Sequence, residues 1–242
     1  MKLIYVYHSG FVIAGDGFTI VIDYYKDPGQ AFIREKILSR PGRLYVLVSH
    51  AHPDHFNPEI GEWKKSRPDI RYIFSGDIRS EFPFQDPAVA FLEKAEVWKD
   101  DCIRIKAYGS TDIGISFRIE VSGKRIFHAG DLNNWHWKEE STLEEAHQAE
   151  EEYKTELEFL ARDTDHIDLA LFPVDPRLGA DYMRGACQFV ERIPTDYFVP
   201  MHFWENYEKA NAFRKFAEER GVKFIVLTRP GREYTVLSSL LI

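Results

Sequence analysis

The segment of residues 50–55, with the sequence HAHPDH, constrains the fold of this chain more than any other feature. Four of its six side chains are imidazoles or carboxylates, the ligand types that suit zinc, iron or manganese. In an extended segment His50, His52 and Asp54 would share one face, and that face cannot hold all four groups. We therefore expect a turn near the proline that sends His55 elsewhere. The spacing favours two neighbouring metals, with His50 and His52 on the first. Asp54 and His55 would then bind the second.

The cluster directly follows the short apolar, β-rich segment Leu44–Val48, which we expect to be a strand. Ligands commonly bind at the carboxyl ends of strands in layered sheets. Two further predicted strands end in the same way: one precedes Asp131, and another precedes His202. A single His or Asp after a strand is more often structural or merely exposed. Together with the cluster, however, these residues indicate one site built from several strand ends.

Hydrophobic patterning predicts a chain of alternating strands and helices. Turn signals separate the predicted strands, which are Lys2–Tyr7, Phe11–Ile13, Phe18–Asp23, Leu44–Val48, Ile70–Phe74, Cys102–Ala107, Ile115–Val121, Arg125–His128, Ile167–Pro173, Tyr197–Pro200 and Lys223–Leu227. Near-helical spacing is found in Gln30–Ser39, Ala88–Lys94, Lys138–Arg162, Tyr182–Arg192 and Tyr207–Arg220. Hairpins first and βαβ winding later predict two mixed sheets packed together, with helices outside.

The length of 242 residues fits one domain, which we predict to span residues 1–242. Within it, residues 138–162 contain nine glutamates and an apolar stripe. This pattern indicates an amphipathic surface helix with a solvated acidic face, and a partner-binding helix is the alternative.

Composition narrows the range of partners. The formal net charge of −8 repels phosphate backbones, so we expect neither long nucleic acids nor anionic membranes as partners. No apolar run approaches the roughly 20 residues that span a bilayer, and the N-terminus resembles a strand rather than a signal peptide. The two cysteines, Cys102 and Cys187, form no metal-type pair and suit a reducing compartment. These observations favour a cytoplasmic location.

These motifs together resemble the metallo-β-lactamase superfamily. The matching pieces are the H-x-H-x-D-H segment at residues 50–55, the Ala-Gly-Asp that ends at Asp131, the strand-end His202, and Asp23 at the end of an early strand. The opening residues 7–11 are similar to those of small bacterial and archaeal hydrolases related to the ascorbate-phosphate lactonases. The resemblance implies a four-layer αββα sandwich of two mixed β-sheets with helices on both outer faces.

The resemblance also implies a site with two divalent transition metals, zinc first, with manganese or iron as alternatives. Its implied ligands are His50 and His52 for the first metal, Asp54, His55 and His202 for the second, and Asp131 as a bridge between the two. Asp54 and Asp131 would take part in catalysis, and Asp23 would support the ligands from behind.

One departure from the superfamily pattern concerns the first metal. The superfamily usually supplies a third histidine from a loop before the bridging aspartate, but the equivalent residues 109–114 contain none. Asp112 is the best substitute, because a carboxylate can replace an imidazole, and a turn-capping residue is the alternative. His8 is the second candidate, either as a ligand or neighbouring donor or as an ordinary strand-end histidine.

The substrate side of the site is marked only weakly. Trp135, His136 and Trp204 follow predicted ligands, and they either form a platform for the substrate or pack a loop against the core. Arg177 also follows a strand end. It either holds a substrate carboxylate or phosphate, or pairs with an acidic neighbour such as Asp175.

We therefore expect a metal-dependent hydrolase. A hydroxide shared by two metals would cleave an ester, lactone or related bond in a small molecule. The first alternative is a phosphodiesterase that acts on a small nucleotide or phosphoester. The others are a di-iron redox protein and a non-catalytic metal-binding or interaction module. Self-association into a homo-oligomer stays open.

Overall fold

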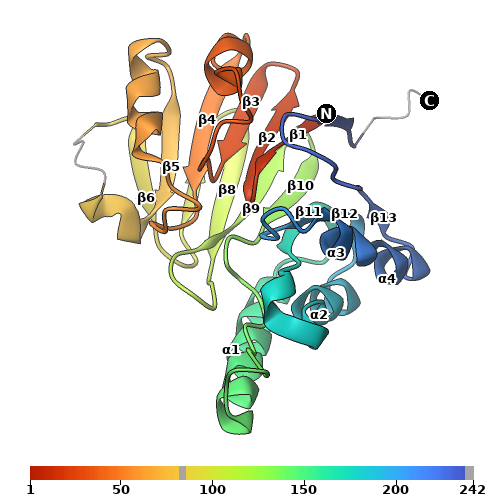
Figure 1. The fold of residues 1–242 in the computed structure, drawn as a ribbon. Coiled ribbons are helices and arrows are strands. Elements are labelled where there is room, and N and C mark those ends of the chain that lie inside the picture. The colour runs from red at the N-terminus through yellow and green to blue at the C-terminus, as the bar shows by residue number, and fades with distance from the viewer. Residues whose placement is uncertain (82–85, 238–242) are drawn as a thin grey trace. The chain divides into compact units, whose positions relative to one another are not determined.

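A computed structural model of the chain describes residues 1–81 and 86–237 (Figure 1). The chain divides into two compact units. The first unit comprises residues 1–93 and 228–242, and the second comprises residues 94–227. Each contains one seven-stranded mixed sheet with its own helices. The prediction of two mixed β-sheets with helices is therefore confirmed, and the single domain stays a prediction.

The sheet of the first unit combines hairpins with parallel strands. Its spatial order is β14 (Glu233–Thr235), β1 (Lys2–Tyr7), β2 (Gly10–Gly15), β3 (Phe18–Ile22), β4 (Arg43–Val48), β5 (Arg71–Ser75) and β6 (Val89–Leu92). β1, β2 and β3 pair antiparallel, whereas β3, β4, β5 and β6 pair parallel (Figure 1). β1 and β3 both run opposite to β2, so the carboxyl ends of β1, β3, β4 and β5 lie at one edge. Residues that follow these four strands are thereby brought close together.

Three short helical segments cover one face of this sheet. They are the π-helical η1 (Ile33–Ile37) and the 3-10 helices η2 (Pro58–Lys65) and η3 (Gly76–Ser80). Their apolar side chains, among them Ile37, Trp63 and Ile78, form one buried core with alternate residues of the strands. Alternation follows from the pleat of the strands, which turns every second side chain to the same face. Val46 and Val48 of β4 are fully buried in this core, so the carboxyl end of the strand is anchored there.

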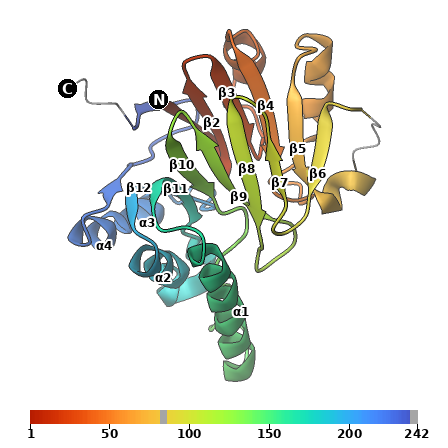
Figure 2. The same ribbon diagram turned by 180° about the vertical axis from the view of Figure 1, so that it is seen from behind.

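The sheet of the second unit repeats this plan. Its spatial order is β7 (Val97–Lys99), β8 (Ile103–Tyr108), β9 (Ser116–Val121), β10 (Lys124–His128), β11 (Ile167–Pro173), β12 (Thr195–Met201) and β13 (Lys223–Phe224). Figure 2 shows the antiparallel strands β8, β9 and β10 side by side, and β10 to β13 pair parallel. The carboxyl ends of β8, β10, β11 and β12 therefore share one edge.

Aromatic packing joins the helices of the second unit to its sheet. These helices are α1 (Leu143–Ala161), the 3-10 helix η4 (Pro176–Asp181), α2 (Arg184–Arg192), α3 (Tyr207–Ala212) and α4 (Arg214–Glu219). Phe189 of α2 lies against Phe127 and Phe172 of neighbouring strands, with ring centroids 5.5 and 4.6 Å apart. Phe213 packs on Phe198 of β12 at 4.7 Å. Such buried aromatic side chains contribute a large share of the core energy.

One predicted element is wrong. Residues Ala88–Lys94 do not form a helix, because Val89–Leu92 is the edge strand β6, which pairs parallel with β5. Its β-branched and aromatic residues fit a pleated surface better than a helix. The short strands β7 and β14 were not predicted at all.

The predicted acidic helix is α1, which begins with a reciprocal capping box between Thr142 and Glu145. Its buried stripe includes Tyr153 and Leu157, and its carboxylate Glu150 binds α2. The Glu150 carboxylate accepts hydrogen bonds from Arg184 at 2.8 Å and from Gln188 at 2.9 Å. Partial burial works to raise the Glu150 pKa, but the hydrogen bonds from Arg184 and Lys154 outweigh it and lower the pKa to about 2.

We expect Glu150→Gln to lower the free energy of unfolding by about 1–2 kcal/mol at neutral pH, because it removes charge-assisted hydrogen bonds between α1 and α2. The folded-state pKa lies below the ordinary 4.5, so this contribution is present above that pH and is lost as pH falls towards about 2. Urea unfolding at pH 7 and pH 3 measures it. Glu152→Gln, on an exposed position of the same helix, is the control. An equal loss at both pH values, or in both variants, contradicts the assignment.

No helix in the described ranges 1–81 and 86–237 is both long and apolar enough to span a bilayer.

Candidate functional site

The histidine segment of the first unit lies directly after β4, at the edge where four strands end. A tight turn follows His52, whose carbonyl oxygen accepts hydrogen bonds from the amides of His55 at 3.0 Å and Phe56 at 2.9 Å. The turn predicted near the proline is thus confirmed. His50 and His55 are fully buried, whereas His52 and Asp54 are half-buried.

Asp23, which follows β3, is the hydrogen-bonding centre behind these histidines. Its carboxylate accepts the Ser49 amide at 2.8 Å and the Ser49 hydroxyl at 2.7 Å, and His55 Nδ1 lies 2.8 Å from Oδ2. The Ser49 hydroxyl also lies 2.9 Å from His50 Nδ1. Asp23 and Ser49 are both fully buried. The sequence-based prediction that Asp23 supports the ligands agrees with these contacts.

This network sets the tautomers of two histidines. A carboxylate only accepts hydrogen bonds, so His55 must carry its proton on Nδ1 to bind Asp23. The Ser49 proton is directed to Asp23, so His50 must likewise donate from Nδ1 to the Ser49 oxygen. Both rings then present the lone pair of Nε2, as a metal-binding histidine oriented by a carboxylate does. The donor chemistry of this unit therefore fits a transition metal.

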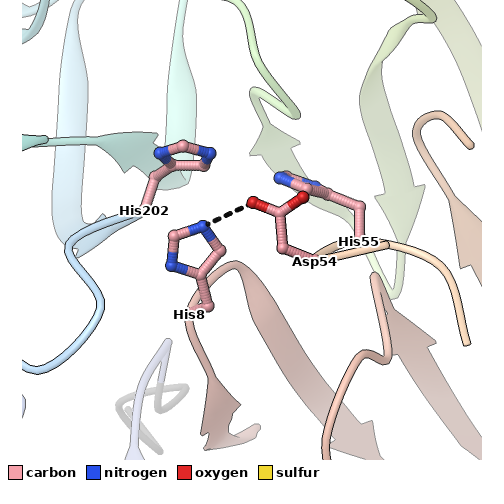
Figure 3. A group of neighbouring side chains, drawn as sticks. All are labelled: His8, Asp54, His55 and His202. Carbon is pink, nitrogen blue, oxygen red and sulfur yellow. Dashed lines mark ion pairs between the residues drawn. The ribbon is translucent and has the colours of Figure 1, made fainter. Parts of the chain in front are cut away.

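His8 comes from the end of β1 and joins the same group. Its Nε2 atom lies 3.3 Å from Asp54 Oδ2 (Figure 3). One donor atom from each of His8, Asp54 and His55 lies within 4.8 Å of the others. This proximity favours His8 as a ligand or neighbouring donor over an ordinary strand-end histidine. The His8 side chain is fully buried, and its amide donates to the Tyr5 hydroxyl at 2.9 Å.

The second unit holds Asp131 in a tight loop after β10. Its carbonyl oxygen accepts the indole N–H of Trp135 at 2.7 Å. The Thr111 hydroxyl bonds the Asn133 carbonyl at 2.6 Å and accepts the Asn133 amide at 3.0 Å. Asp131 Oδ1 lies 3.3 Å from His202 Nε2, and both side chains are almost completely buried. The loop backbone therefore fixes where the Asp131 carboxylate points.

His202 follows β12 and is oriented by Asp175, which follows β11. His202 Nδ1 lies 2.9 Å from Asp175 Oδ2, so its Nε2 is the atom turned towards Asp131. Burial works to raise the pKa of the Asp175 carboxyl, but hydrogen bonds from His202 and Arg177 outweigh it and hold the pKa below its usual value. Asp175 thus gives His202 the same support that Asp23 gives His55.

Arg177 binds mainly to the Asp175 carboxylate. Its Nε and Nη2 atoms lie 2.9 and 2.6 Å from Asp175 Oδ2. The salt bridge predicted as one alternative is therefore present, and contact with a substrate anion stays a prediction. The guanidinium also lies 5.8 Å from the Trp137 ring.

The residues predicted on the substrate side of the site lie in different environments. The Trp135 ring lies edge-on to His202 at 5.3 Å and is stacked on Trp137 at 6.1 Å. His136 is almost fully buried, with Nε2 3.3 Å from the Asp181 carbonyl, and burial lowers its pKa. Trp204 is half-buried and has a positive φ of 53°. The contacts of Trp135 and His136 favour loop packing over a substrate platform.

Asp112 lies in the loop after β8 and is exposed. A carboxylate oxygen of Asp112 lies within 4.8 Å of one of Asp131. This proximity agrees with a substituted ligand, and the exposure agrees with the turn-residue alternative, so the role of Asp112 stays a prediction.

Several residues of the candidate site have a strained backbone. Positive φ angles, which non-glycine residues rarely adopt, occur at His8 (56°), Asp23 (46°), Trp137 (39°) and His202 (62°). Such conformations persist where the surroundings impose them and are common at functional sites.

Three supporting residues were not predicted from the sequence. They are Ser49, Thr111 and Asp77, the last of which accepts the Ala51 amide at 2.8 Å. Ser49 had a usable signal, because it directly precedes the cluster and has a hydroxyl. Asp77 had none, since it is 26 residues away from its partner.

Residues 2–202 match the family described as the beta-lactamase superfamily domain. The chain belongs to the metallo-β-lactamase superfamily. Within it, the chain is similar to UPF0173 metal-dependent hydrolases. That of Symbiobacterium thermophilum is 25% identical, with 98% of this chain and 100% of the relative covered. That of Nanoarchaeum equitans is also 25% identical, with 95% and 97% covered. The fold is shared with Igni18, a metallo hydrolase of Ignicoccus hospitalis, at a TM-score of 0.70, 20% identity, and coverage of 96% and 97%.

Proposed function

We propose that this member of the metallo-β-lactamase superfamily is a metal-dependent hydrolase of small molecules. One observation supports it above all: His50, His55 and His202 are buried, and each has its Nδ1 against a hydroxyl or carboxylate oxygen. An imidazole held in this way offers Nε2 as a ligand.

The proposed ligands form two sets. His50 and His52 would hold one metal, with Asp112 as a further ligand. Asp54, His55 and His202 would hold another, with His8 beside Asp54 as an added donor. Asp131 would bridge the two. The relatives named as metal-dependent hydrolases support this assignment, and zinc is the metal that best suits mixed imidazole and carboxylate ligands.

When bound, the metals would supply Lewis acidity that activates water and polarises the substrate oxygen. Asp54, half-buried at the turn, would accept a proton from the attacking water and orient it. Asp23 and Asp175 would keep the imidazoles in their ligating tautomers. A serine or cysteine nucleophile is not required, and burial raises the pKa of the Cys187 thiol to about 11, which keeps it protonated.

We propose an ester, lactone or related bond in a small molecule as the target. The acidic net charge disfavours long polyanions as substrates. Arg177, the strongest candidate for binding a substrate anion, is engaged by Asp175. The engagement of Arg177 weighs against the phosphodiesterase alternative, which the same assay tests.

Protein purified without chelators is expected to contain between one and two equivalents of transition metal, because the proposed ligands form two sets. Elemental analysis measures this content. Removal of the metal by a chelator should abolish hydrolysis, and added zinc should restore it. An ester, a lactone and a phosphodiester should be tested on the same samples.

Each outcome of this assay separates the candidates. Hydrolysis of the phosphodiester alone favours the phosphodiesterase. Metal without hydrolysis of any substrate favours a non-catalytic binding module. A wild-type protein that contains no metal and regains none after incubation with zinc contradicts the hydrolase proposal.

A further inference from the structure

A carboxylate outside the predicted ligand set touches the histidine segment itself. Asp77 lies in the first turn of η3, which follows the carboxyl end of β5. Its Oδ2 atom accepts a hydrogen bond from the Ala51 amide at 2.8 Å. Ala51 is the residue between His50 and His52. This hydrogen bond ties the histidine segment to the carboxyl end of β5, as Asp23 ties it to the carboxyl end of β3.

The topology explains why this contact forms. β4 and β5 are adjacent and parallel, so their carboxyl ends lie side by side. Ser75 has an extended backbone with ψ of 149°, and the chain then turns into η3. Ile78 of η3 is fully buried in the core of the first unit, which anchors the turn that carries Asp77. The acceptor is therefore held by packing rather than by a flexible loop.

The position of this hydrogen bond matters for both neighbouring histidines. The Ala51 amide belongs to the peptide plane between His50 and Ala51, so fixing its direction restricts the ψ of His50 and the φ of Ala51. These are two of the four backbone angles that set how the His52 side chain is directed relative to that of His50. Their ring centroids lie 4.7 Å apart. An error of about 1 Å in such a pair is enough to cost about a hundredfold in function.

The hydrogen bonds of Asp77 differ from those of Asp23. Asp23 orients His55 directly and His50 through the Ser49 hydroxyl, besides accepting the Ser49 amide. Asp77 acts on the backbone. Its second oxygen, Oδ1, is buried and has no hydrogen-bond partner within the described residues. Keeping a buried carboxylate oxygen in this state costs free energy, which is typical of a residue retained for a purpose other than stability.

We propose that Asp77 is a positioning residue that holds His50 and His52 in register for one metal. This inference rests on the proposed function, because it concerns the affinity of a metal position. It assigns Asp77 to the position served by His50 and His52, whereas Asp23 and Ser49 act on His50 and His55. Loss of the Asp77 bond should therefore weaken one metal equivalent and leave the other nearly unchanged.

The experiment compares Asp77→Ala with Asp77→Asn in the full chain. The asparagine variant keeps an oxygen that can accept the Ala51 amide, whereas the alanine variant does not. Metal-free protein is titrated with cobalt(II), followed by its visible absorption, and exchange of the Ala51 amide hydrogen is followed by NMR. We expect Asp77→Ala to weaken one equivalent by about 10–100-fold and to speed the exchange, and Asp77→Asn to stay within about threefold of wild type.

Asp27→Ala is the matched control. Asp27 also accepts backbone amides in the first unit, those of Gly29 at 2.8 Å and Phe32 at 3.0 Å, but touches no histidine. It should leave both equivalents intact. Equal weakening in Asp77→Ala and Asp77→Asn overturns the positioning role, because the charge would then matter rather than the hydrogen bond. So does wild-type binding in Asp77→Ala. A wild type that binds no cobalt defeats the proposed function itself.

Discussion

Asp131→Asn is expected to release at least one metal equivalent and to slow hydrolysis by about 10²–10⁴-fold, the range that several kcal/mol of lost transition-state stabilisation implies. The substitution keeps the size of the side chain but removes its charge. Asp131 is proposed to bridge the two metals, so an amide there weakens both positions. The backbone bonds from Trp135 and Thr111 do not involve the carboxylate, so the fold should persist.

Asp196→Asn is the matched control for this prediction. Asp196 also lies in the second unit and also pairs with an imidazole, His166, at 3.0 Å, but both side chains are well exposed. It should retain full metal content and full activity. Elemental analysis and steady-state kinetics on both variants measure the difference. Wild-type metal content in Asp131→Asn would remove Asp131 from the ligand set.

The strand ends were predictable because their signals are local. β4 is a short run of apolar and β-branched residues, and the ligands begin within two residues of its end. The same holds for β12 and His202. Strands buried in a core leave such continuous apolar runs, so their positions can be derived from the sequence. The turn after His52 also has a local cause, the proline beside it.

The edge elements were harder to predict because their pattern is weak. β6 has only half-buried residues apart from Leu92, so it lacks the continuous apolar run of a central strand. β7 and β14 are three residues long. An edge strand is stabilised by one neighbour on one side, and its sequence is correspondingly less constrained.

Two of the supporting contacts were beyond sequence reasoning for a different reason. Asp175 and Asp77 act on partners 27 and 26 residues away, and the contacts arise only when parallel strands bring their ends together. Nothing in the local sequence indicates which nearby carboxylate faces which imidazole. The ligand types could be derived from chemistry, whereas the partners that orient them depend on the register of the sheet.

Asp23→Asn is the second variant with a large expected effect. The parallel pairing of β3 with β4 places Asp23 against both Ser49 and His55. We expect the substitution to weaken metal binding at His55 by about 10–100-fold and to destabilise the fold by about 1–3 kcal/mol. Asp23 accepts three hydrogen bonds in the native protein, from the Ser49 amide, the Ser49 hydroxyl and His55 Nδ1. An asparagine cannot accept all three, because one of its two positions is now a donor.

Either orientation of the new amide produces a conflict. If its oxygen still accepts the Ser49 amide, its NH₂ group faces His55 Nδ1. His55 must then give up the Nδ1 proton and carry it on Nε2, which removes the lone pair that would bind a metal. If the amide is flipped, the NH₂ group faces the Ser49 N–H instead, and two buried donors oppose each other. The first orientation avoids these opposed donors and is therefore the one we expect.

Ser49→Ala separates the two halves of this network. It removes the link to His50 but leaves the direct bond between Asp23 and His55, so its effect on metal binding should be smaller than that of Asp23→Asn. The ring ¹⁵N shifts of His55 report the tautomer directly, and a cobalt(II) titration reports affinity. A His55 ring that keeps its Nδ1 proton in Asp23→Asn would contradict the mechanism even if the affinity fell, because the loss would then arise from disorder rather than from a wrong tautomer.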